Sequence, residues 1–300
     1  MKKIIPIIFV ALCLLQACRI TTKSNEGQKN RIEFSDKIGG CVFTEIQNTN
    51  KVSPLNLTIK IESIKGEFSK KMNVLGLDFI AMYKVSDDFL KDVGQTMEEM
   101  FPQDSTLDLP RQHRVLNNLL QYKATIPVIV GHHDSMPEKV MTEMEYVYEK
   151  ECSICDVIMY KQPGQTMEVV EHLLHFITDI GLHYEYPKEW AFNTTSSEVY
   201  IVMQEAIEKG FYDVNSYKDM ENEKEIHQRV IVQEFAYWLI STYWNLQEKY
   251  GPQEDEWIIK NKEDLKDRFP KGYQLVENTV NKIMKAPSNS ILEKLETYGE

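Results

Sequence analysis

Residues 166–184 read TMEVVEHLLHFITDIGLHY and constrain the fold of the second half of the chain. Apolar residues recur there every three or four positions, which is the period of an amphipathic helix. Thr166 suits the N-cap of such a helix, and Gly181 suits the position just after its end. We therefore expect a helix over 166–181. Its apolar stripe consists of Val169, Val170, Leu173, Leu174, Ile177 and Ile180.

The opposite stripe of this helix is polar and consists of Glu168, Glu171, His172 and His175. Residues three and four positions apart share one face of a helix, so these side chains are neighbours. Carboxylates and imidazoles both ligate zinc, which predicts a metal site. A solvated helix face requires no metal, and that simpler interpretation stays open.

Glu171-His172-Leu173-Leu174-His175 resembles the HExxH motif of zincin metallopeptidases, with its first two residues exchanged. In that motif two histidines bind zinc and the glutamate activates water. The resemblance implies a zinc-dependent hydrolase that acts on a protein or peptide substrate. Two assignments stay open for this chain. Glu171 and His175 ligate zinc with His172 as the base, or His172 and His175 ligate it with Glu171 carrying the proton.

In the glutamate-type zincins a third zinc ligand lies on a later helix, and Glu234 is the candidate here. It falls in an aromatic stretch, within a helix expected over 226–250, that contains Phe235, Tyr237 and Trp238. A carboxylate in such a buried helix is costly unless it is paired or bound to a metal. The resemblance therefore implies Glu234 as a ligand and Tyr237 as a group that assists an oxyanion. A lysine partner for Glu234 is the alternative.

The pattern along the whole chain predicts an α+β fold, with a mixed strand and helix N-terminal half followed by a helical C-terminal half. The regions are 36–164, of α/β character, and 165–300, helical and carrying the candidate site. Expected strands cover 40–62, 73–84, 125–130, 146–151 and 156–160, and expected N-terminal helices cover 86–100 and 110–122. Expected C-terminal helices cover 166–181, 197–209, 224–249, 262–268, 271–284 and 289–298.

The first 17 residues have a Lys2-Lys3 start and a short apolar run, which is typical of a signal peptide. Leu15-Gln16-Ala17-Cys18 follows and resembles the bacterial lipobox. The resemblance implies that Cys18 is lipidated with acyl chains such as palmitate. Polar residues 18–35 then form a flexible tether. We expect an exported protein that is anchored by lipid in the cell membrane or the outer membrane.

Composition limits the partners of the protein. The chain has 300 residues and a formal net charge of −12, which argues against nucleic acid as a partner. The acidity and the altered motif leave an alternative function open, a non-catalytic lipoprotein of the cell envelope that binds a partner or ligand.

Cys152 and Cys155 form a CxxC that could close a disulfide. Residues 131–134 read GHHD and suit either metal or substrate binding or a polar turn.

Overall fold

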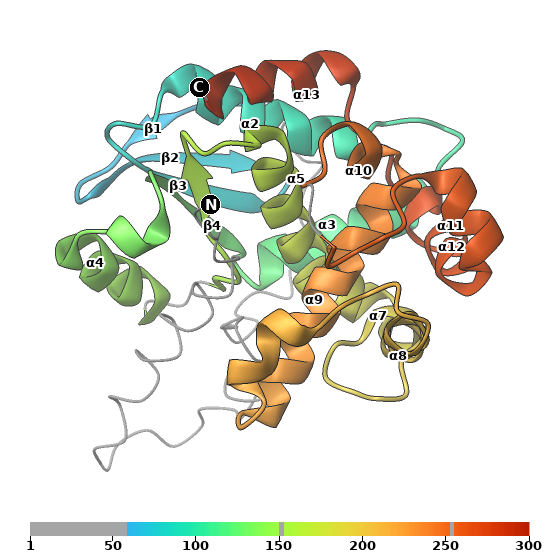
Figure 1. Ribbon diagram of the computed structural model, residues 1–300. Coiled ribbons are helices and arrows are strands. Elements are labelled where there is room, and N and C mark those ends of the chain that lie inside the picture. The colour runs from blue at the N-terminus through green and yellow to red at the C-terminus, as the bar shows by residue number, and fades with distance from the viewer. Residues whose placement is uncertain (1–58, 150–152, 253–254, 300) are drawn as a thin grey trace, which may run out of the picture.

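The computed structural model describes residues 59–149, 153–252 and 255–299. A five-stranded sheet occupies the N-terminal part, and helices make up the remainder of the fold (Figure 1). The predicted α+β class is therefore confirmed. The predicted signal peptide, the predicted lipidation site Cys18, the predicted tether 18–35 and most of the expected strand region 40–62 lie outside the described residues. No helix of the described part is long and apolar enough to cross a membrane.

The sheet is mixed and follows chain order. β1, β2 and β3 pair antiparallel, and β3, β4 and β5 pair parallel. The strand predicted over 73–84 is confirmed for Leu77–Met82 but starts later than expected, because Leu75 and Gly76 adopt positive φ (52° and 91°) and form the turn of a hairpin. The strand predicted over 125–130 is confirmed. The strands are β1 (Glu62–Ser63), β2 (Phe68–Val74), β3 (Leu77–Met82), β4 (Thr125–Val130) and β5 (Ile158–Tyr160).

Successive strand residues point to opposite faces of the sheet, so their side chains pack in two separate hydrophobic cores. Val128 of β4 joins the main core, which α2 (Asp87–Met100), α3 (Leu109–Gln121) and α5 (Gln165–Phe176) cover. Ile129 points to the other face and packs in a smaller cluster with Val140 of α4 (Glu138–Glu149). The strand expected over 146–151 is wrong, because 146–149 end α4. The earlier turns of α4 contain Glu, Lys and Met, which favour helix, and the helix continues through 146–149.

The other predicted helices lie close to their expected positions. The one expected over 224–249 is interrupted at Asn245, whose φ of +60° breaks the helical hydrogen-bond ladder. The one expected over 271–284 ends as an α-helix at Asn278. The helices beyond α5 are α6 (His183–Glu185), α7 (Pro187–Trp190), α8 (Glu198–Glu208), α9 (Lys224–Tyr243), α10 (Leu246–Lys249), α11 (Lys262–Arg268), α12 (Pro270–Asn278) and α13 (Asn289–Glu296).

Helix α5 starts and ends differently from the prediction. Gly164, with a φ of +74°, precedes its first turn, and the hydroxyl of Thr166 donates to a carbonyl of α13 instead of capping. The helix does not end at Gly181. It continues through a π-helical segment, Ile177–Leu182, into α6. Gly181 allows α3 to approach closely, since a Cβ there would lie 2.8 Å from Cγ1 of Val115.

Helix α5 lies between the sheet and α9, and it contacts β5, α9 and α13 (Figure 1). Every residue of α5 is buried, including both glutamates and both histidines of its polar stripe. The interpretation of this stripe as a solvated surface is therefore wrong. Its polar groups must find their partners inside the protein.

Candidate metal centre

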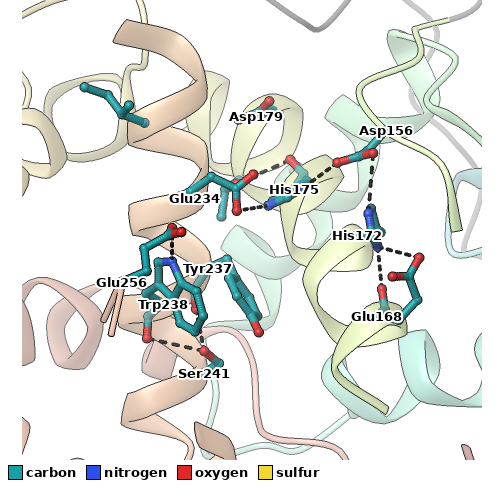
Figure 2. Close-up of polar contacts among 12 residues, drawn as sticks. Asp156, Glu168, His172, His175, Asp179, Glu234, Tyr237, Trp238, Ser241 and Glu256 are labelled. Carbon is teal, nitrogen blue, oxygen red and sulfur yellow. Dashed lines mark hydrogen bonds and ion pairs between the residues drawn. The ribbon is translucent and has the colours of Figure 1, made fainter. Parts of the chain in front are cut away.

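Three side chains from two helices converge in the interior. Glu171 and His175 lie one turn apart on α5, and Glu234 reaches across from α9, as Figure 2 shows for Glu234 and His175. One ligand atom of each lies within 4.8 Å of the others, and His175 Nε2 is 3.6 Å from Glu234 Oε2. All three side chains are buried. These residues could hold a metal ion, because a histidine with two carboxylates is a known type of metal-ligand set.

Two atoms of this group lack a hydrogen bond within the described chain. They are Oε1 of Glu171 and Nε2 of His175, and both are buried. Burial raises the pKa of Glu171 well above its usual value, and the nearby Glu234 carboxylate raises it further. Two buried carboxylates at such short range repel each other. A divalent cation between them would remove this repulsion and satisfy both orphaned atoms, so the residues present fit a metal.

Asp156 supports the centre from behind. It lies in the segment before β5, and its Oδ2 is 2.8 Å from Nδ1 of His175 (Figure 2). This contact keeps a proton on Nδ1 and turns Nε2 toward Glu234, so a metal ion would bind Nε2 by displacing the proton that Glu234 favours there. A carboxylate behind a histidine ligand is a common arrangement in metal sites. Burial would lower the pKa of His175, but Glu234 and Asp156 outweigh it and raise that pKa well above its usual value.

His172 lies on the far side of Asp156 from the three converging residues. Its Nε2 is 3.4 Å from Oδ1 of Asp156, and its Nδ1 contacts the backbone carbonyl of Glu168. Burial lowers the pKa of His172, but the Asp156 and Glu168 carboxylates raise it to about 9. His172 therefore carries a proton at neutral pH and is a poor base. Of the two open assignments, the structure brings together the ligands of the one that pairs Glu171 with His175, but His172 lies outside this group and suits neither the role of ligand nor that of base.

Glu168 and Tyr237, the remaining residues of the predicted site, have different surroundings. The Glu168 carboxylate accepts a hydrogen bond from Met159 N at 2.7 Å and so ties α5 to β5. The Tyr237 ring lies perpendicular to that of His175, with centroids 6.2 Å apart. Burial raises the pKa of Tyr237 well above its usual value, and the Glu171 carboxylate adds to the shift. Its hydroxyl therefore stays protonated close to Glu171.

One turn beyond His175, the π-helical segment carries a buried ion pair. Asp179 Oδ2 lies 3.0 Å from Nη2 of Arg229 on α9. His183 follows on α6, where its Nδ1 accepts a hydrogen bond from Phe192 N at 3.2 Å. Burial, together with the Arg229 charge, lowers the pKa of His183 to about 3, so this ring is neutral. The first contact ties the π-helical segment to α9, and the second ties α6 to the chain just after α7.

Asp156 is the residue of the centre that the sequence analysis did not identify. A signal for it exists, because this carboxylate stands between the apolar pairs Ile154-Cys155 and Val157-Ile158. An acidic residue inside an apolar run is expensive to bury without a partner.

Comparison of the chain with family models, with curated proteins and with solved structures finds no match. The chemistry of the centre therefore has to be judged from its own residues.

Proposed function

We propose that this protein is a zinc-dependent hydrolase of the cell envelope, exported and anchored through a lipidated Cys18. Glu171, His175 and Glu234 hold the zinc, and a protein or peptide is the substrate. One observation carries the metal proposal. Oε1 of Glu171 and Nε2 of His175 are buried without hydrogen bonds in the described chain, beside the Glu234 carboxylate.

The number and kind of ligands support a catalytic role. Three protein ligands leave a fourth position for water in a tetrahedral site. Zinc, when bound, lowers the pKa of that water toward 7. Asp156 holds the His175 ring in place by accepting from Nδ1. Tyr237 keeps its proton and can donate a hydrogen bond to an oxyanion that develops next to Glu171.

Cysteine chemistry supports the exported location. Cys155 is disulfide-bonded, and the other cysteines of the chain lie outside the described residues. Disulfides persist in oxidising compartments and are rare in reducing ones.

The lipid anchor is tested by changing Cys18→Ser and separating the proteins of lysed cells between a detergent phase and an aqueous phase. The wild-type chain is expected in the detergent phase and the variant in the aqueous phase. Equal partitioning of both would exclude lipidation at Cys18.

A second function is favoured by the burial of all three ligands. A closed site suits a metal that stabilises the fold, as in a non-catalytic envelope lipoprotein that binds a partner. The two functions share the metal and differ in turnover. Hydrolysis of a fluorogenic protein substrate that stops on chelation and resumes with Zn²⁺ supports the enzyme. Full metal occupancy without turnover on a broad peptide library supports the stabilised binding protein.

The metal itself is tested by elemental analysis of purified protein. His175→Ala removes a ligand, and His113→Ala removes an exposed histidine on α3 as the matched control. We expect close to one transition-metal ion per chain at this centre in the wild type and in the control, and its loss in His175→Ala. Wild-type protein that neither carries a metal nor takes up added Zn²⁺ would refute the proposed function.

A further inference from the structure

A second group of metal-competent side chains lies in the loop after β4, on residues that the proposed function does not use. His132, His133 and Asp134 are consecutive there, and their ligand atoms lie within 4.8 Å of one another. Gly131, with a φ of +79°, turns the chain at the end of the strand. A single turn of 3₁₀ helix, His133–Ser135, follows and places both imidazoles beside the Asp134 carboxylate.

The carboxylate of Asp134 divides its two oxygens between the two rings. Oδ2 lies 3.3 Å from Nδ1 of His132, and Oδ1 lies 3.2 Å from Nε2 of His133. The Asp134 N–H also reaches Nδ1 of His132 at 3.3 Å, which is long for a hydrogen bond. An ion at that nitrogen would therefore replace only a weak contact.

His133 provides an independent indication of a ligand. Its side chain is only 3% exposed, yet neither ring nitrogen makes a hydrogen bond with any part of the chain that the structure describes. A buried imidazole normally satisfies both nitrogens, and leaving them unmade costs stability. His132 and Asp134 are 40% and 57% exposed, so the group opens to water on one side. An ion could enter there and keep water as its remaining ligands.

We propose that His132, His133 and Asp134 bind a divalent transition-metal ion in the loop after β4. Two imidazoles and one carboxylate suit zinc, nickel, copper or iron. Magnesium and calcium prefer ligand sets made entirely of oxygen. This site shares no ligand with the centre between α5 and α9. It therefore goes beyond the proposed function and does not depend on it.

Metal stoichiometry tests this site. Metal-stripped protein is titrated with Zn²⁺ in competition with a chromophoric chelator, for the wild type and for His132→Ala, Asp134→Asn, His175→Ala and the control His113→Ala. His132 and Asp134 are exposed enough for substitution to leave the fold intact, which circular dichroism checks. We expect wild type and control to bind one ion more than either loop variant. Loss of an outer-shell partner alone weakens metal binding ~10–100-fold, so loss of a ligand should weaken the loop ion by at least about tenfold.

The variants separate the two sites. If His132→Ala and Asp134→Asn bind as many ions as the wild type, with equal affinity, the loop site is refuted, whatever His175→Ala does. If a single ion is bound and only the loop variants lose it, the loop site stands and the centre at His175 fails. Two ions, of which each set of variants removes one, support both.

Discussion

Helices α2 and α5 border the same main core, but they satisfy their buried carboxylates in different ways (Figure 1). Asp92 of α2 is buried and accepts from Lys294 Nζ at 2.7 Å and from the Tyr298 hydroxyl at 2.6 Å. Glu171 of α5 is equally buried, has an oxygen without a hydrogen bond to the described residues, and lies beside Glu234. The charge on α2 is balanced by the chain itself. The charge on α5 requires a proton or a cation from outside.

Among the following changes, His175→Ala should cause the largest loss in the free energy of unfolding. This change removes a metal ligand and takes from Asp156 its shorter imidazole contact, which leaves His172 as its remaining imidazole partner. Removing one partner of a buried ion pair costs ~3–5 kcal/mol. Urea unfolding in the presence of Zn²⁺ measures it. Lys294→Ala is the matched change on α2, and it should cost clearly less because that lysine is 55% exposed. Equal losses for the two variants would remove the contrast between the helices.

The next largest effect is a dependence of stability on pH in metal-free protein. The folded pKa of His172 is about 9, against an ordinary value of 6.5, because carboxylates outweigh its burial. The native state thus holds a proton that the unfolded state releases, and this stabilisation is complete below pH 6.5 and lost as pH rises toward 9. At about 1.36 kcal/mol per pKa unit, the loss is on the order of 3 kcal/mol. Urea midpoints at pH 6 and 9, with chelator, measure it.

His172→Gln should flatten this slope, since a glutamine cannot titrate. The raised pKa of Glu171 acts in the same direction, because its folded form also retains a proton that the unfolded chain loses above about pH 4.5. A variant that keeps the full wild-type slope between pH 6.5 and 9 would show that His172 does not carry the proton.

Neutralising each buried carboxylate should change stability in opposite directions. In metal-free protein at pH 8, Glu171→Gln removes a carboxyl that must hold a proton in the fold but releases it in the unfolded chain, so we expect a gain of ~1–3 kcal/mol. Asp92→Asn weakens two charge-assisted hydrogen bonds, so we expect a loss of similar size. Added Zn²⁺ should reverse the sign for Glu171→Gln only. If both variants are less stable than the wild type without metal, the proposed difference between the buried carboxylates of α2 and α5 is wrong.

The smallest change in the free energy of unfolding is expected for a substitution on the solvent-exposed side of α2. Lys91 is 55% exposed, and its Nζ lies 3.8 Å from Oδ1 of Asp88. Exposed pairs of this kind contribute little, so Lys91→Ala should change the free energy of unfolding by less than about 0.5 kcal/mol, with or without Zn²⁺. Thermal unfolding is sufficient to measure it. A larger change would mean that α2 is less tolerant of substitution than its exposure indicates.

Much of this fold could be predicted from periodicity, because amphipathic helices such as α2 and α3 follow the apolar pattern closely. The positions of turns and of helix ends were harder to predict. The turn at Leu75-Gly76 lies in a continuous apolar run, and Gly181 resembles a terminator although it serves close packing with α3. In both places tertiary contacts decide what a local pattern leaves open.

The candidate centre was partly predictable for a related reason. Helical spacing brings Glu171 and His175 together, and the cost of burying Glu234 marks it as unusual. Spacing alone could not orient His172, because adjacent helical residues differ by about 100° in direction. Asp156 comes from a different element, and only the pairing of β5 with β4 and the packing of α5 on β5 bring it to His175.

The π-helical segment Ile177–Leu182 has a consequence for the two ends of its helix. A π turn takes up an additional residue compared with α pitch, so the segment absorbs one residue without changing the phase of the helix on either side of it. Deleting one residue from the segment should therefore restore α pitch, leave Glu171 and His175 facing α9, and leave His183 beside Phe192. The main change would be a local one, at the backbone hydrogen bonds around Asp179.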